Sequence, residues 1–148
     1  MSEKSEPVLP RKIIACVDGS DLSFRAVGYA SQLAKVVGSK VVVLHVVLLP
    51  PYAATHTLEA LRKDLSSKGQ DILTKASQLV EANSVMAEER LVETNRSVVL
   101  AITEEAEKVQ AELIVLGTRG TSGMPKLMLG SVAAGVVSSA HCPVLAVR

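Results

Sequence analysis

Short apolar runs alternate with segments of helical periodicity along most of the chain, and this alternation constrains the fold most strongly. The clearest runs cover residues 13–17, 41–49, 113–116 and 144–147, and a weaker, more polar run covers 90–94. A strand that is apolar throughout is buried on both faces, as in parallel sheets that are covered by helices. The sequence therefore predicts an α/β fold with an open, doubly wound, parallel five-stranded sheet.

Apolar residues recur at helical spacing between these runs. The first helix is expected to start at Ser20 or Asp21, either of which can cap it, and to end at Gly38. Further helices are expected over about 58–79 and 98–109.

A last helix is expected from near Ser131. No linker interrupts the pattern, so residues 11–148 are expected to form a single domain. The polar residues 1–10 are expected to form a disordered tail.

Composition argues against several kinds of partner. The formal net charge is +1, which gives no electrostatic reason to expect nucleic acid or an anionic membrane. The chain has two tyrosines, one phenylalanine and no tryptophan, so platforms for stacking bases are scarce. No apolar run is long enough to span a bilayer, and the charged N-terminus lacks the pattern of a signal peptide. A cytoplasmic protein is expected.

A glycine-rich segment follows the fourth apolar run directly. Residues 117–123 include three glycines, and Gly130 and Ser131 then precede a helical run that begins at Val132. Ligands of such sheets bind beyond the carboxyl ends of the strands, and the free N–H groups of a helix start attract phosphate. From the residues alone, a flexible connector explains these glycines equally well.

Motifs for several other chemistries are missing. The chain has no Walker-type Gly-x-x-x-x-Gly-Lys, and Asp18-Gly19-Ser20 replaces the Gly-x-Gly-x-x-Gly turn of dinucleotide-binding folds. The histidines show no metal-binding spacing, and no nucleophile elbow is present. The sequence therefore predicts no catalytic residue.

The spacing Gly117-x-x-Gly120, nine residues, Gly130-Ser131 resembles the phosphate motif of the universal stress protein family, in its ATP-binding branch. Residues 17–20, 44–47, 113–117 and 142–147 also resemble segments of that family, so that the resemblance covers about residues 11–148.

This resemblance implies an adenine nucleotide alpha-hydrolase-like fold with strand order 3-2-1-4-5. It also implies that adenine nucleotide, with ATP preferred, contacts Cys16, Asp18, Val46, Leu116, Gly117, Arg119, Gly120, Gly130, Ser131 and Val132. Either Val46 or Val47 is expected to line the adenine pocket. Asp18 is expected to bind the ribose hydroxyls or a phosphate-bound Mg²⁺, although it can also serve as a turn or helix cap.

Other assignments remain open at this point. Arg119 is not a motif residue, and it is either a phosphate contact, a solvated loop residue or a dimer contact. Lys126 can add positive charge to the phosphate loop, and Tyr52 can stack on the base.

The resemblance implies a dimeric, nucleotide-dependent regulatory module of the stress response. The homodimer is expected to pair the edge strand 144–147 of two subunits, and a further protein partner is possible. A slow Mg²⁺-dependent ATPase and a nucleotide-free interaction scaffold are the alternatives.

Overall fold

Strands and helices alternate along the chain in the computed structural model, which describes residues 8–51, 55–120 and 128–148. The elements are β1 (Lys12–Cys16), α1 (Asp21–Val37), β2 (Lys40–Leu48), α2 (Thr55–Glu81), β3 (Ala87–Thr94), α3 (Val98–Lys108), β4 (Leu113–Gly117), α4 (Ser131–Ser139) and β5 (Val144–Val147). All four strand pairings are parallel, and the strand order is β3-β2-β1-β4-β5. The predicted fold class and strand order are confirmed.

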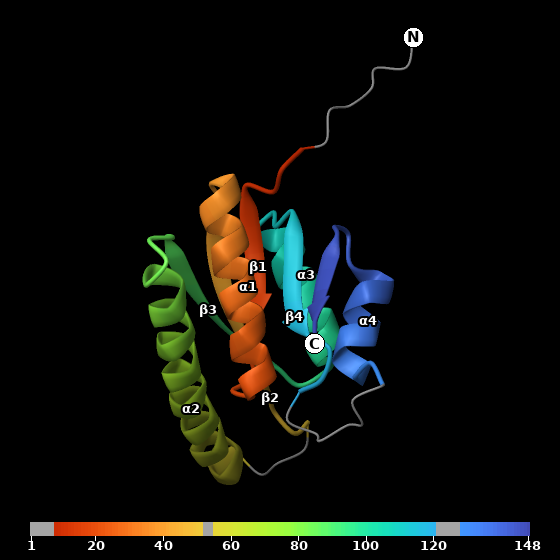
Figure 1. The fold of residues 1–148 in the computed structure, drawn as a ribbon. Helices are drawn as coiled ribbons and strands as arrows, with labels where there is room; N and C mark the ends of the chain where they lie inside the picture. Colours follow the sequence, from red (N-terminus) through yellow and green to blue (C-terminus); the bar gives the residue numbers. More distant parts are fainter. Residues whose placement is uncertain (1–7, 52–54, 121–127) are drawn as a thin grey trace.

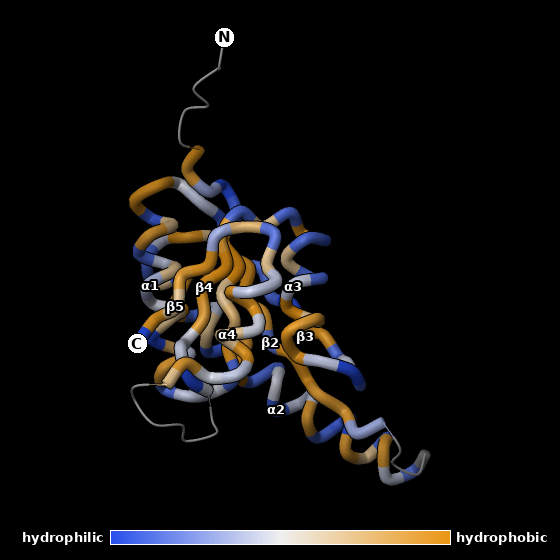
Figure 2. The backbone as a smooth tube through the Cα atoms, turned by 90° about the vertical axis from the view of Figure 1, so that its right-hand side faces the viewer, coloured by the Kyte–Doolittle hydropathy of each residue, from blue (hydrophilic) through white to orange (hydrophobic). Residues whose placement is uncertain are grey.

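The sheet separates two layers of helices, with α1 and α2 on one side and α3 and α4 on the other (Figure 1). Neighbouring residues of one strand therefore enter different cores: Ile13 belongs to the core under α1 and α2, and Ile14 to the core under α3 and α4. Both side chains are fully buried. The central strands appear as continuously hydrophobic tubes for this reason (Figure 2).

Helix α1 begins and ends where its capping residues predict. The Ser20 side chain accepts a hydrogen bond from the backbone N–H of Ser23, and Gly38 follows the helix in the left-handed conformation with φ of 80°. Helix α2 starts earlier than its apolar pattern indicates, at Thr55, and extends beyond the sheet (Figure 1). No helix in the described ranges is both long and apolar enough to cross a bilayer.

Strand β3 is longer than predicted, because it starts at Ala87 rather than Arg90. It is an edge strand, and its added residues Glu88 and Glu89 are exposed, so they show no apolar signal. Side chains of α2 and α3 hold this strand instead: Ser77 donates to Glu89 over 2.8 Å, and Arg90 Nε donates to the buried Glu105 over 2.6 Å.

Candidate functional site

A cleft of about 290 Å³ opens at the carboxyl ends of the central strands. Its walls come from the ends of β1, β2 and β4, the loop after β4, and the first turns of α3 and α4. The lining residues are Cys16, Val17, Asp18, Ser23, Leu44, His45, Val46, Val98, Ile102, Leu116, Gly117, Thr118, Arg119, Gly120, Gly130, Ser131, Val132 and Ala133.

All ten residues that the sequence assigned to a nucleotide site line this one cleft. Their contact with a nucleotide stays a prediction. Of the two valines considered for the base pocket, Val46 lines the cleft, while Val47 does not belong to its lining. Tyr52 and Lys126 lie outside the described residues.

One end of the cleft is apolar. Cys16, Val46 and Leu116 project from three neighbouring strands on the side of α3 and α4, and Val98 and Ile102 of α3 face them. Burial raises the pKa of the Cys16 thiol from 9.0 to about 12, so the thiol is neutral at physiological pH. This wall can receive a flat apolar group but offers no charge.

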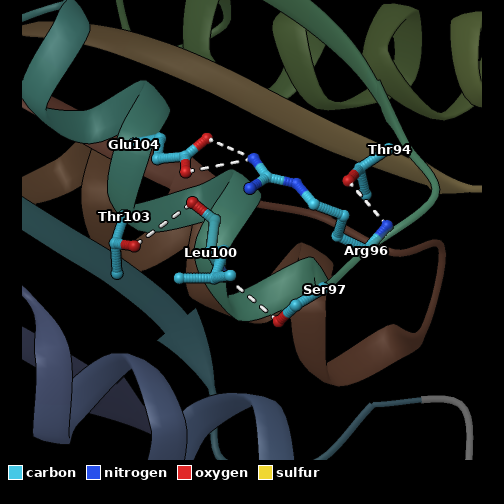
Figure 3. A network of polar contacts seen from close by, with 6 residues as sticks. All are labelled: Thr94, Arg96, Ser97, Leu100, Thr103 and Glu104. Atoms are coloured by element: carbon cyan, nitrogen blue, oxygen red, sulfur yellow. Dashed lines mark hydrogen bonds and ion pairs between the residues drawn. The ribbon is translucent and has the colours of Figure 1, made fainter.

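The start of α3 is fixed by a polar network that lies outside the cleft (Figure 3). Ser97 Oγ accepts from the N–H of Leu100 at 3.3 Å, and Arg96 Nη2 lies 3.2 and 3.3 Å from the two carboxylate oxygens of Glu104. Thr94 Oγ1 accepts from the N–H of Arg96 at 3.2 Å. Among these bonds, the one from Leu100 to Ser97 is the cap of α3, and the helix begins at Val98 in the cleft wall.

Asp18 follows β1 at the rim and forms a local turn. Its Oδ1 accepts from the N–H of Ser20 at 2.9 Å and from Ser20 Oγ at 2.6 Å, and Gly19 between them has φ of 93°. The alternative role of Asp18, as a turn residue beside the cap of α1, is therefore present. Its second oxygen points the other way, because a Cβ on Gly120 would lie 2.5 Å from Oδ2. Asp18 thus serves the turn with one oxygen and faces the glycine loop with the other.

The loop after β4 brings backbone groups to the other end of the cleft. Thr118 donates its N–H to Val147 O at 2.8 Å, and its carbonyl accepts from the N–H of Gly130 at 2.6 Å. Gly130 is the N-cap of α4, and the hydrogen bond from Ala134 N to Gly130 O at 2.9 Å closes the first turn of that helix. The N–H groups of residues 131–133 precede this bond and have no partner within their own helix, so they can receive an anion.

Arg119 adds a positive charge to this polar end. Its Nε is buried and has no hydrogen-bond partner in the described part of the chain. A buried guanidinium nitrogen without an acceptor costs free energy, and a bound anion would remove that cost.

Sequence reasoning missed several residues of the lining. Val98 and Ile102 were assigned only to an apolar helix face, and neither Ser23 nor Thr118 was singled out, although both are buried polar residues. The position of Thr118 inside the glycine motif was a usable signal for its place in the cleft. Within residues 8–51, 55–120 and 128–148, no three metal-ligating side chains of His, Cys, Asp or Glu gather at one place.

The fold and this cleft define a doubly wound α/β protein whose candidate site joins an apolar wall to a glycine-containing loop and a helix start. The model of the universal stress protein family matches residues 10–148, and the chain belongs to this family. A universal stress protein of Methanocaldococcus jannaschii is 36% identical over 143 residues, which cover 95% of this chain and 83% of the relative. Universal stress protein YxiE of Bacillus subtilis is 33% identical, over 93% of this chain and 98% of its own length.

Solved structures of the family have the same fold. The universal stress protein UspA of Lactobacillus plantarum superposes with a TM-score of 0.83 at 24% identity, covering 93% of this chain and 97% of its own. A universal stress protein solved in complex with cAMP has a TM-score of 0.73 at 29% identity, covering 94% and 97%. The protein from Archaeoglobus fulgidus in complex with dAMP has a TM-score of 0.74 at 24% identity, covering 93% and 97%.

Proposed function

We propose that this chain binds an adenine nucleotide, ATP in particular, in the cleft and acts as a dimeric, nucleotide-dependent regulatory module of the stress response. The observation that carries the proposal is the polarity of the cleft. Cys16, Val46 and Leu116 form an apolar wall at one end, and the start of α4 with Arg119 forms an anion site at the other. An adenine nucleotide has the same division between a flat base and a charged phosphate chain.

The helix start cannot provide the affinity by itself. A helix dipole contributes about 0.3–1 kcal/mol to the binding of an anion, and up to ~2 kcal/mol in a partly buried site. Micromolar binding requires about 8 kcal/mol in total. Most of the affinity therefore has to come from Arg119, whose Nε has no partner among the described residues, from the backbone donors of the loop and from burial of the base against the apolar wall.

Asp18 fits the role of a ligand for phosphate-bound Mg²⁺. Magnesium is usually held by one or two carboxylates together with the phosphates of its nucleotide, rather than by a complete protein cage. Asp18 is exposed at the rim and directs one oxygen toward Gly120. The same oxygen is also an acceptor for ribose hydroxyls, and a titration with and without Mg²⁺ separates the two roles.

The nucleotides bound to two relatives support the choice of an adenine ligand, since one was solved with cAMP and another with dAMP. ATP is preferred to these monophosphates because the polar end offers both the amides of α4 and Arg119, which suits more than one phosphate. Isothermal titration of the whole chain with Mg-ATP, AMP and cAMP tests this preference. ATP is expected to bind most tightly, and absence of heat with all three nucleotides would overturn the proposal.

Two further measurements address the alternatives. Mass spectrometry of the small molecules released when the purified protein is denatured is expected to show an adenine nucleotide, which a nucleotide-free scaffold would not carry. Steady-state hydrolysis faster than about 1 per second, an ordinary enzyme rate, would instead indicate an ATPase.

We propose that the homodimer forms through β5 and that the protein is cytoplasmic. Strand β5 lies at the edge of the sheet, Leu145 on it is 37% exposed, and Val137 of the neighbouring α4 is 51% exposed. Pairing of two β5 strands would cover this apolar edge. Sedimentation at micromolar concentration is expected to show a dimer that Leu145→Lys converts to a monomer, and a monomeric wild type would refute the arrangement.

A further inference from the structure

His45 of β2 forms a hydrogen bond that the nucleotide proposal does not use. Its Nδ1 lies 2.8 Å from the carbonyl oxygen of Val17, the residue before Asp18. A carbonyl only accepts, so Nδ1 carries the proton and donates it. The His45 side chain lies on the α2 side of the sheet, with that of Val43, whereas Leu44 and Val46 face the core beside the cleft.

His45 is one of the residues that line the cleft, and we propose that it is a positioning residue: its imidazole, which packs against α2, holds Asp18 in place for the nucleotide through the carbonyl of Val17. The inference rests on the proposed function, because Asp18 matters here as a ligand contact. In this role the His45 side chain binds the backbone of Val17 and does not itself contact the nucleotide.

The Val17 carbonyl lies just beyond the end of the pairing between β1 and β2. The register between β1 and β2 ends at Cys16 with Leu44, and the N–H of Val17 still donates to Leu44 O at 2.9 Å. The Val17 carbonyl accepts its hydrogen bond from the side chain of His45. Val17 is 3% exposed, so removal of the imidazole would take away the hydrogen-bond donor to its carbonyl in a buried position.

Val17 is joined directly to Asp18 in the cleft lining. Asp18 follows at once, and its own N–H donates to Ser23 Oγ at 3.3 Å. Its Oδ1 is held by Ser20, so the direction of Oδ2 depends on the backbone of residues 17–20. A change in the Val17 carbonyl therefore turns the carboxylate that faces Gly120.

The imidazole ring of His45 is confined by helix α2. A Cβ on Gly69 of α2 would lie 2.7 Å from His45 Cδ2 and 3.2 Å from Nε2, so the helix backbone packs directly on the ring. The ring cannot swing toward α2 to release the carbonyl. A Cβ on Gly69 would also lie 2.9 Å from Leu91 Cδ1, so a side chain at this point would crowd both the ring and Leu91.

A matched pair of substitutions tests the inference. Asn and Leu have the same branched shape, but in His45→Asn the amide nitrogen takes the place of Nδ1 and can donate to Val17, whereas His45→Leu has no donor. The Mg-ATP affinity of His45→Leu is expected to be about fivefold to tenfold weaker than that of His45→Asn, as the loss of one buried hydrogen bond predicts. In urea unfolding, His45→Asn is expected to be the less stable of the two variants, because its carbonyl oxygen Oδ1 lies beside apolar residues. The order of stability is then the reverse of the order of affinity.

Affinity that simply follows stability, or equal affinities of the two variants, would overturn the inference. Gly69→Ala supplies a second route should His45→Leu fail to fold. It keeps the imidazole but displaces it, so it is expected to weaken Mg-ATP binding severalfold, while Gly28→Ala, where a Cβ meets nothing within 4 Å, leaves binding unchanged. Wild-type affinity in Gly69→Ala would count against the mechanism.

Hydrogen exchange of the unliganded protein separates this inference from the proposed function. The amides of residues 18–20 are expected to exchange faster in His45→Leu than in His45→Asn. If the wild type binds no nucleotide, the proposed function fails, and this comparison still decides whether His45 holds the turn. Equal exchange in the two variants would show that it does not.

Discussion

Replacement of Gly130 by alanine tests the geometry of the cleft most directly. Gly130 adopts φ of −61° and ψ of 156°, which alanine adopts without strain. The space around it is the restriction, because a Cβ would lie 3.0 Å from Thr118 O and 3.5 Å from the Cα of Arg119. Both neighbours are backbone atoms of the loop after β4, so they can give way only if the loop moves.

The magnitude follows from opposing terms. Alanine reduces the conformational freedom of the unfolded chain, which stabilises by about 0.4–1 kcal/mol at a compatible site. Against this, the 2.6 Å hydrogen bond from Gly130 N to Thr118 O is strained by the same contact, at a cost of about 1 kcal/mol. Stability is therefore expected to change by less than about 1 kcal/mol.

Binding is expected to change more than stability. The added methyl group separates the start of α4 from Arg119, and these are the two groups proposed to share the phosphates. A loss of about 1.4 kcal/mol, or tenfold in affinity for Mg-ATP, is expected for Gly130→Ala, and a larger loss for Gly130→Val.

Isothermal titration and urea unfolding of the same samples check this prediction. Gly28→Ala is the matched control, since it is a glycine-to-alanine change in the interior of α1 with no atom within 4 Å of the new Cβ. It is expected to raise stability by about 0.5–1 kcal/mol and to leave the affinity unchanged. Unaltered ATP affinity in both Gly130 variants would refute the assignment of the phosphate site.

Three other predictions concern single side chains. Arg119→Gln is expected to weaken ATP binding about tenfold but adenosine binding hardly at all, as titration of both ligands will show, because the lost charge lies at the end of the cleft proposed to hold the phosphates. Alkylation of Cys16 at pH 8, followed by mass spectrometry, is expected to be about 1000-fold slower than that of a free thiol. The reason is that the rise of its pKa from 9.0 to about 12 keeps it protonated, and the same rise makes the native state less stable as the pH increases from 9 toward 12. Glu105→Gln is expected to lower the free energy of unfolding in urea by about 1–2 kcal/mol, because Glu105 is 6% exposed and pairs with Arg90.

The apolar runs allowed most of the fold to be predicted, because burial on both faces leaves a direct trace in the sequence. The caps of α1 at Ser20 and Gly38 could also be predicted from the sequence. A serine side chain accepts a hydrogen bond from a free N–H of the first turn, and glycine adopts the left-handed conformation that follows the last turn. The start of β3 at Ala87 could not be predicted from the sequence. Its residues face solvent at a sheet edge and are held by side chains of α2 and α3, and such long-range pairs leave no local pattern.

The candidate site also contains residues that could be predicted from the sequence and residues that could not. Residues that end strands or flank the glycine motif could be placed at one rim from the order of the elements. Val98 and Ile102 could not, because their place in the cleft depends on how α3 packs against the sheet. The role inferred for His45 depends on a hydrogen bond from β2 to Val17, the residue that follows β1, so spacing along the chain does not reveal it.

The glycines after β4 had two equally good explanations, a phosphate cradle and a flexible connector. The structure argues against flexibility as the reason for Gly130, because a Cβ there would lie 3.0 Å from the backbone oxygen of Thr118. At Gly120 a Cβ would lie 2.5 Å from Oδ2 of the Asp18 side chain. Close packing therefore accounts for these glycines without any ligand. What packing does not account for is the buried Nε of Arg119, which lacks a partner in the described residues, and the amides of the first turn of α4, which have no partner within their own helix. These donors, more than the glycines, are the reason to expect an anion in the cleft.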